Sequence, residues 1–322
     1  MLTYIARRFL YSIPVLLVSS FLSFMFISAA GDPLGQLRIQ RNISQHTLRS
    51  LAIQYHLNVS IPQRYLYWLE DVFLHKFGKS LITLQPLWPD ITRTMGHTLQ
   101  IVMTAEILAM ILGIAVGIYS AIRQYSIFDY FFTSFSFLGF AMPVFWLALI
   151  LQIAFVDIYL HWHVRIFYTS SLNSTPGGSA WSVDRLQHIA LPVFTLLVIS
   201  FALYSRFMRA SMLDVLNTDY VRTARAKGLP EWRVIMGHVF RNALIPIATV
   251  AALNIGATFG GAIVTETVFT LDGMGYYFVN RLGALDLYAV MAYLFIVSVF
   301  IILFNLIADI LYGFLDPRIR YD

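Results

Sequence analysis

Six long apolar runs constrain the fold of this chain more than any other feature. A helix needs about 20 apolar residues to cross the roughly 30 Å hydrocarbon core of a bilayer. The runs cover residues 9–30, 98–122, 128–160, 188–207, 244–268 and 287–314. Only 12% of all residues are charged and 58% are hydrophobic, which is too few charges for the surface of a soluble globule. The sequence therefore predicts an all-α polytopic membrane protein with six transmembrane helices.

The remaining composition narrows the function classes. The chain contains no cysteine, which excludes disulfides, thiolate metal ligands and a cysteine nucleophile. Its net charge of +5 is not concentrated on a soluble domain, so the sequence does not indicate binding to nucleic acid. We interpret the excess of Lys and Arg as a topological signal, because cytoplasmic loops of membrane proteins are enriched in these residues.

The positions of the basic residues predict the orientation in the membrane. If the N-terminus is cytoplasmic, the inside segments hold Arg7, Arg8, Arg123, Arg206, Arg209, Arg222, Arg225, Lys227, Arg233, Arg241, Arg318 and Arg320. The short outside loops then hold only Arg165, Arg185 and Arg281. The other basic residues lie in residues 31–97, and long segments cross the membrane largely regardless of charge. We therefore expect both termini to be cytoplasmic.

The first apolar run has two interpretations, because it follows Arg7 and Arg8 as a cleaved signal peptide would. A signal core has about 7–15 apolar residues, whereas this run extends over residues 9–30. We therefore expect residues 1–30 to form a short cytoplasmic start and a retained first transmembrane helix.

Residues 31–97 are the segment with the character of a soluble domain. Leu48, Leu51 and Tyr55 follow Ser44 at helical spacing, and a second apolar cluster surrounds Trp68. The pattern predicts a small, partly helical extracytoplasmic domain. The five remaining spans are expected to form a core over residues 98–318, followed by a cytoplasmic tail at 319–322.

A polar segment at residues 211–243 separates the fourth and fifth apolar runs. Apolar and small residues recur at helical spacing from Leu213 to Lys227, and Gly228 and Pro230 then interrupt the helix. A second amphipathic run leads from there toward Pro246. Two short helices joined by a tight turn would form a knob suited to a partner's groove. From spacing alone, a solvated basic loop is the equal alternative.

Several motifs occur in a fixed order along nearly the whole chain. The longest reads Asp-Tyr-Val-Arg-Thr-Ala-Arg-Ala-Lys-Gly-Leu-Pro at residues 219–230 and continues with Arg-Asn-Ala-Leu-Ile-Pro at 241–246. The others are Tyr-Ile-Ala-Arg-Arg at 4–8, Gly-Asp-Pro at 31–33, Ala-Met-Pro-Val-Phe-Trp at 141–146, Glu-Thr-Val-Phe at 266–269, Gly-Met-Gly at 273–275 and Leu-Asp-Pro-Arg at 315–318. Together they resemble the permease subunits of binding-protein-dependent ABC importers. They are most similar to the first of the two paired permeases in the dipeptide, oligopeptide and nickel group, although the usual Glu-Ala-Ala is Thr223-Ala224-Arg225 here.

The resemblance implies a type I ABC importer permease fold in a prokaryotic cytoplasmic (inner) membrane, with the chemistry located in other subunits. The implied partners are a second permease, two ATPase subunits that bind ATP and Mg, and an extracytoplasmic substrate-binding protein that delivers peptides. The chain itself would hold no cofactor, metal or catalytic residue. The segment at 219–246 would couple the ATPases to the membrane helices, chiefly through Asp219, Tyr220, Arg222, Thr223, Ala224, Arg225, Ala226, Lys227, Gly228, Leu229 and Pro230.

Six residues are candidates for the translocation pathway: Glu106, Pro143, Gly256, Gly260, Gly261 and Glu266. A carboxylate at Glu106, inside the second run, is costly unless it faces water or a partner, and the alternative is a hydrogen-bonded glutamate at a helix interface. The glycines of the fifth run fit either a sliding gate or static close packing. Pro143 predicts a kink in the long third run, which fits either a broken pore helix or accommodation of the length of the run.

An ionic contact is also expected near the inner end of the sixth run. Asp309 is a carboxylate in an apolar helix, and Arg206 or Arg209 of the fourth run is its expected partner.

Four other hypotheses compete with a peptide permease. The first is a metal site at His161 and His163, but these two histidines lack a third ligand nearby and fit membrane anchors better. An ion-coupled secondary transporter would need inverted repeats and buried ion ligands, which the two halves do not display. An intramembrane enzyme would need a group of catalytic residues within the spans, and the sequence shows none. Gly78-Lys79-Ser80 resembles the end of a phosphate-binding loop, but the first glycine of that loop is missing. Nickel or glutathione transport within the same group is the fourth.

Overall fold

The computed structural model describes residues 2–39, 44–175 and 179–315. Its helices are α1 (Leu2–Ala30), α2 (Gly35–Ile39), α3 (Gln45–Gln54), α4 (Ile61–Leu74), α5 (Leu87–Ile122), α6 (Ile127–Ala141), α7 (Val144–Trp162), α8 (Val183–Leu216), α9 (Asp219–Ala226), α10 (Glu231–Arg233), a π-helical segment (Val234–Phe240), α11 (Arg241–Gly261), α12 (Ile263–Val268), α13 (Met274–Gly283) and α14 (Leu287–Leu315). The prediction of an all-α fold is confirmed.

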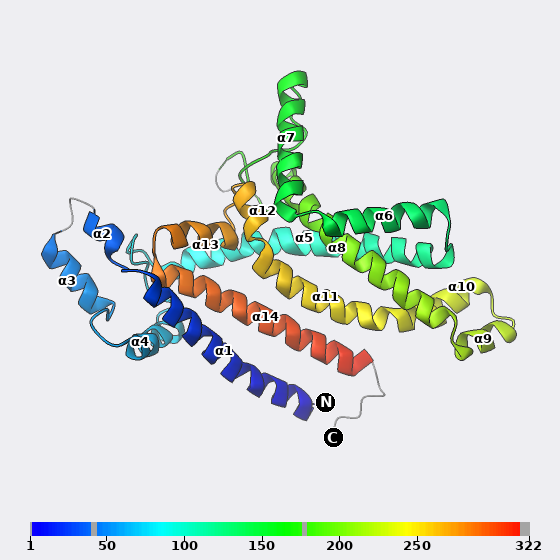
Figure 1. The fold of residues 1–322 in the computed structure, drawn as a ribbon, viewed down its shortest axis with the longest axis horizontal. Helices are drawn as coiled ribbons and strands as arrows, with labels where there is room; N and C mark the ends of the chain where they lie inside the picture. Colours follow the sequence, from blue (N-terminus) through cyan, green and yellow to red (C-terminus); the bar gives the residue numbers. More distant parts are fainter. Residues whose placement is uncertain (1, 40–43, 176–178, 316–322) are drawn as a thin grey trace.

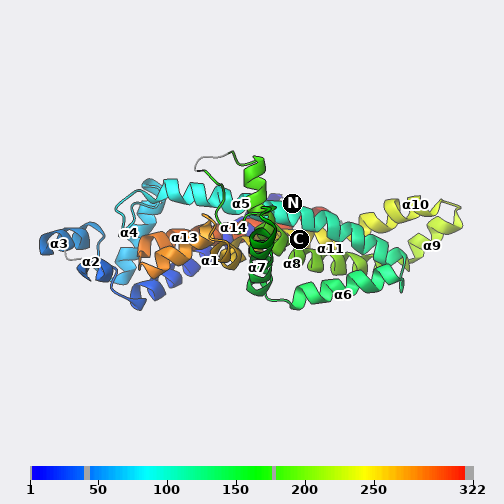
Figure 2. The same ribbon diagram turned by 90° about the horizontal axis from the view of Figure 1, so that it is seen from above.

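The helices form an elongated bundle with a different structure at each end. The long helices α1, α5, α8, α11 and α14 run along the bundle, α2–α4 lie at one end and α9 and α10 at the other (Figures 1 and 2). Six helical stretches in the described residues are long and apolar enough to cross a membrane: Ile5–Ala29, Leu87–Ile122, Val144–Trp162, Val183–Leu216, Glu231–Val268 and Leu287–Leu311. The six predicted apolar helices are therefore present, and the chain has the organisation of a multi-pass membrane protein.

Two glycines of α5 let it lie close against α8, its most extensive neighbour. A Cβ atom added at Gly113 would lie 2.8 Å from the Cβ of Tyr204, and one at Gly117 would lie 2.6 Å from the Cβ of Met208. Because only glycine leaves this space empty, the two backbones approach through a glycine-xxx-glycine contact, which is typical of helices packed within membranes.

The prediction of one long third span over residues 128–160 is wrong. The chain breaks at Met142 and Pro143, both of which are extended (ψ 124° and 135°), because proline disfavours a helical conformation in the residue before it. Pro143 therefore precedes α7 and does not kink a continuous helix. The first half, α6, packs against α8, whereas α7 stands across the long axis of the bundle (Figures 1 and 2) and buries only Ala148.

The end formed by α2–α4 and the segment at 75–86, which we call the cap, is fixed to the bundle by an aromatic core and one carboxylate. Trp68 of α4 is fully buried between Phe24 of α1 and Phe295 of α14. The buried carboxylate of Asp286 accepts hydrogen bonds from the Ser80 hydroxyl and from the Leu81 N–H at 3.1 Å. Helix α5 begins at Leu87, so its first residues lie within the segment 31–97 for which we expect a separate domain.

The start of α1 lies beside the end of α14 (Figure 1), where Arg8 forms an ion pair with Asp309 at 3.3 Å. The expected pairing of Asp309 with Arg206 or Arg209 is therefore wrong. Arg209 binds the carboxylate of Asp129 on α6 through two hydrogen bonds of 2.7 and 2.8 Å, and that nearer partner neutralises it.

Candidate functional site

The end of the bundle opposite the cap carries a compact helical projection, residues 217–233, which we call the knob. Helix α9 turns back through Gly228, whose φ of +76° lies in a region that residues with a Cβ rarely adopt. Val221 and Ala224 of α9 are buried against Val234 and Ile235. The inner face of the knob is thus an apolar core of its own, continuous with the ends of α8 and α11.

The boundaries of the knob differ from the expected ones. The first helix does not begin near Leu213, because α8 continues through Leu216 and the chain breaks only at Asn217 and Thr218. The second helix is not separate from the fifth span. After α10 the backbone widens into the π-helical segment and passes directly into α11, since no proline intervenes before Pro246. Such π-helical turns occur frequently at functional sites.

The outer face of the knob presents polar, basic and aromatic side chains. Tyr220 is 44% exposed and Trp232 70% exposed, and the side chain of Arg222 is exposed as well. Arg225 is partly committed within the knob, since it donates hydrogen bonds to both oxygens of Glu231, the shortest at 2.8 Å. These hydrogen bonds hold the pKa of Arg225 above its ordinary value.

The predicted coupling residues therefore divide into an inner and an outer set. Ala224 faces inward together with Val221, a residue outside the predicted set, while Leu229 is half-buried and Gly228 makes the turn. The residues left on the outside are Asp219, Tyr220, Arg222, Thr223, Arg225, Ala226, Lys227 and Pro230, and Trp232, outside the predicted set, is exposed as well.

The carboxylate of Glu106 lies deep in the bundle, 1% exposed, at the junction of α5, α8 and α11. It accepts hydrogen bonds from Ser200 Oγ at 2.7 Å and Tyr204 Oη at 2.6 Å on α8. From α11, Asn254 Nδ2 donates at 3.0 and 3.1 Å and Thr258 Oγ1 at 2.9 Å. The sequence did not predict these four partners, although each is a polar residue inside an apolar run.

The glycines of α11 lie on a different face from Asn254. A Cβ added at Gly256 would lie 3.1 Å from the Cβ of Phe304, and one at Gly260 would lie 3.2 Å from Val297 Cγ1. Both glycines therefore face α14 within this chain, while Gly261 ends α11. The helix thus presents a polar stripe to α5 and α8 and a smooth stripe to α14.

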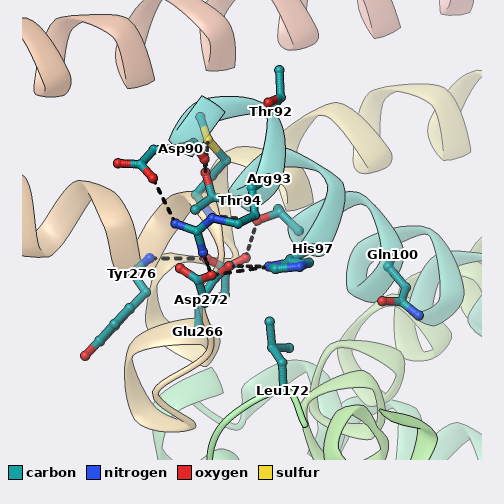
Figure 3. A network of polar contacts seen from close by, with 12 residues as sticks. Asp90, Thr92, Arg93, Thr94, His97, Gln100, Leu172, Glu266, Asp272 and Tyr276 are labelled. Carbon is teal, nitrogen blue, oxygen red and sulfur yellow. Dashed lines mark hydrogen bonds and ion pairs between the residues drawn. The ribbon is translucent and has the colours of Figure 1, made fainter. Parts of the chain in front are cut away.

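Glu266, 0% exposed, organises the corner between α12, α13 and α5 (Figure 3). Its carboxylate accepts hydrogen bonds from Thr98 Oγ1 at 2.6 Å, Gly275 N at 2.7 Å and Tyr276 N at 3.2 Å. It thereby satisfies free N–H groups at the start of α13. A Cβ at Gly273 would lie 2.4 Å from this carboxyl group, so the glycine is required for the carboxylate to sit there.

A series of linked ion pairs covers the same corner on the side of the cap. Arg93 of α5 pairs with Asp272 and, at 3.1 Å, with Asp90. Asp90 is also 3.5 Å from Arg281, and Asp272 O lies 2.7 Å from His97 Nδ1. Figure 3 shows Arg93, His97 and Asp272 converging from α5 and the loop before α13. The corner is held by alternating charges.

In the described residues, the histidines near the end of α7 are not surrounded by further side chains that could bind a metal ion with them. His161 Nδ1 lies 3.1 Å from Asp157 Oδ1 on the preceding turn. Among the residues that the structure describes, no group of three or more His, Cys, Asp or Glu side chains could hold a metal ion.

The fold and these features define a class: a multi-pass transmembrane protein with buried polar networks between its helices and an exposed helical knob at one end. The chain belongs to the family of binding-protein-dependent transport system inner membrane components, whose model matches residues 113–321. This finding confirms the resemblance derived from the motifs and, with it, the permease fold.

Relatives with high sequence similarity match over their full length. The oligopeptide transport system permease protein AppB of Bacillus subtilis is 40% identical, with 100% of both chains covered. The dipeptide transport system permease protein DppB of Escherichia coli is 34% identical over 100% of this chain and 99% of its own. Among solved structures, one described as an amino acid ABC transporter with histidines has 11% identity and a TM-score of 0.49, covering 72% of this chain and 94% of its own.

Proposed function

We propose that this chain is one of two paired permease subunits of an ATP-driven importer and forms, with its partner, the path by which peptides cross the cytoplasmic membrane. The observation that carries the proposal is the full-length similarity to oligopeptide and dipeptide permeases at 34–40% identity. Nickel and glutathione systems share the general architecture, but the relatives named above are peptide permeases.

In this proposal the knob is the element that docks on an ATPase subunit. Its outer face offers an exposed aromatic side chain at Trp232 and the exposed cations Arg222 and Lys227. Aromatic and arginine residues are enriched where interfaces concentrate their binding energy. Because the knob shares its core with α8 and α11, a displacement of the knob would be transmitted to those helices. ATP and Mg would bind to the ATPases and not to this chain.

The orientation follows from that assignment. The knob and both termini would face the cytoplasm, while the cap and the corner around Glu266 would face the extracytoplasmic binding protein. The excess of Lys and Arg in the segments thereby placed inside accords with the positive-inside rule. The proposed pathway residues remain Glu106, Pro143, Gly256, Gly260, Gly261 and Glu266, of which Glu106 lies at the junction of three long helices.

Reconstitution tests the proposal. The chain, co-expressed with its second permease and two ATPases, is placed in liposomes with ATP inside and peptide-loaded binding protein outside. We expect import of labelled trialanine that requires both ATP and the binding protein. Import by this chain alone without ATP would contradict the proposal and favour a secondary transporter.

A single substitution tests the knob. Gly228→Glu places a side chain at a φ of +76° and a negative charge on the docking face, so we expect the subunit to assemble in the membrane but to lose ATP-driven import. Gly283→Glu is the matched control at the opposite end of the bundle, where an added Cβ meets no atom within 4 Å. Normal import by the Gly228→Glu complex would refute the coupling role.

A further inference from the structure

A cleft of about 1100 Å³ opens between α5, the start of α8 and the loops that precede α8 and α13. Arg93, His97 and Gln100 line it along one face of α5 (Figure 3), Leu172 and Asp272 come from the two loops, and Arg185 comes from α8. It lies away from the knob, on the side of the bundle that carries the cap. Its volume equals or exceeds that of a typical small-molecule site.

Arg185 is a buried cation without a charged partner in the described residues. The residue Arg185 is only 2% exposed to solvent. Nε donates to Gln100 Oε1 at 3.0 Å and Nη1 to Leu172 O at 3.4 Å, and both acceptors are neutral. In the described part of the chain, no Asp or Glu oxygen lies within 4.0 Å of this guanidinium. A buried charge without an opposite charge is costly, so an anion placed next to Arg185 would be stabilised.

The other charges around the cleft are already compensated. Asp272 is paired with Arg93 and lies 3.6 Å from His97. Asp184, next to Arg185 in the sequence, accepts hydrogen bonds from Ser174 N and Oγ at 2.9 and 2.5 Å and lies 3.6 Å from His188. The charge of Arg185 is therefore the one left without an opposite charge among the described side chains that line the cleft.

The Gln100 amide holds Arg185 in place for a ligand. Its oxygen accepts from Arg185 Nε, and its nitrogen donates to Ala180 O. The guanidinium is thus fixed by neutral groups, and none of its described hydrogen bonds uses Nη2. A planar carboxylate matches a guanidinium edge, because two parallel N–H···O bonds can form.

We propose that this cleft binds the C-terminal carboxylate of a peptide through Arg185 as the peptide passes from the binding protein to the permeases. The inference rests on the proposed function. Every linear peptide carries this carboxylate whatever its sequence, so one anchored cation serves substrates of many sequences. The walls of the cleft then do not need to recognise any particular side chain of the peptide.

The test compares trialanine with its C-terminal amide in the reconstituted importer. The fraction of binding protein loaded with each peptide is measured separately, and import is expressed per loaded binding protein, which removes discrimination by the binding protein itself. In Arg185→Gln we expect import efficiency for trialanine to fall at least tenfold and that for the amide to stay within twofold. Arg185→Lys keeps the charge but loses the paired geometry, so we expect an intermediate, several-fold loss confined to trialanine.

Controls separate the possible outcomes. Arg165→Gln removes an exposed arginine from the same loop region, where it lies over the rings of Tyr159 and Tyr168, and should leave both peptides unchanged. ATPase stimulation by empty binding protein reports assembly and docking. An equal loss for both peptides in the Arg185 variants, or lost stimulation by empty binding protein, would overturn the inference and make Arg185 a structural or docking residue.

Two further outcomes complete the test. If Arg185→Gln does not assemble, Arg185→Lys decides alone, and an unchanged ratio of trialanine to amide import in that variant overturns the inference. Absence of peptide import by the unsubstituted complex would instead refute the proposed function, so the two failures are distinguishable.

Discussion

The side-chain amide of Asn254 donates to both oxygens of the Glu106 carboxylate, at 3.0 and 3.1 Å, across the junction between α11 and α5. Asn254 Nδ2 also lies 3.1 Å from Ser200 Oγ and 3.2 Å from Tyr204 Oη on α8. One carboxylate therefore ties together three long helices, among them the two that continue into the knob. A tilt of α11 relative to α5 and α8 has to break or rearrange these hydrogen bonds.

Glu106→Gln should destabilise the subunit. An amide offers one acceptor oxygen in place of two and turns an NH₂ group toward hydroxyl and amide donors. With buried donors left unpaired, we expect a loss of about 1–3 kcal/mol, measured as a lower thermal unfolding temperature of the purified complex. The matched control is Glu70→Gln on the exposed surface of α4, which should leave that temperature unchanged. Equal temperatures for the two variants would mean that the network does not stabilise the bundle.

Gly117→Ala should weaken the contact between α5 and α8. The added methyl group would lie 2.6 Å from Met208 Cβ and 2.7 Å from Ser205 O, and the backbone oxygen cannot move without shifting α8. Overpacking of this kind costs about 1–3 kcal/mol. Gly96→Ala on the same helix meets no atom within 4 Å and serves as the control. The measurement is the fraction of folded monomer recovered in detergent after a heating series, which should drop for Gly117→Ala alone.

The apolar runs predicted most of the long helices, because a long apolar segment in a bilayer must satisfy its backbone hydrogen bonds internally. The helix ends were harder to place. Helix α5 begins at Leu87 and α8 ends at Leu216, outside the apolar runs, since polar residues extend a helix where water is present. Pro143 was recognised as a disruption, but whether a proline kinks or ends a helix depends on what each half packs against.

The hydrogen-bond networks around Glu106 and Glu266 could be predicted from the sequence only in part. Glu106 was identifiable as a carboxylate in an apolar run, but its partners lie 94 to 152 residues away along the chain, and no local pattern pairs them. The capping role of Glu266 depends on a turn that returns Gly275 to it. Gly113 and Gly117 have the glycine-xxx-glycine spacing typical of close helix contacts in membranes, so this contact could have been predicted from the sequence.

Gly273→Ala should disrupt the corner around Glu266. The new methyl group would lie 2.4 Å from all three carboxyl atoms, so the carboxylate must leave the N–H groups of Gly275 and Tyr276. Unpaired buried groups cost about 1–3 kcal/mol each. We expect faster proteolytic cleavage between α12 and α13. The measurement is limited proteolysis of the complex in the membrane, with the fragments detected by gel electrophoresis. Gly283→Ala, at the other end of α13 with no atom within 4 Å, should be cleaved at the rate of the unsubstituted protein.

Trp232→Ala should weaken binding of the ATPase subunit without destabilising the knob. The side chain is 70% exposed, so its removal should change the unfolding temperature of the subunit little. An exposed tryptophan that becomes buried in a partner's groove commonly contributes about 2 kcal/mol or more to binding, equivalent to a roughly 30-fold weaker association. Binding of the purified ATPase subunit to the permease pair in nanodiscs measures this association. Trp162→Ala, 74% exposed at the end of α7, is the matched control and should bind normally. Unchanged ATPase binding by Trp232→Ala would place the docking contact elsewhere on the knob, whereas a lower unfolding temperature would show that the side chain stabilises the fold.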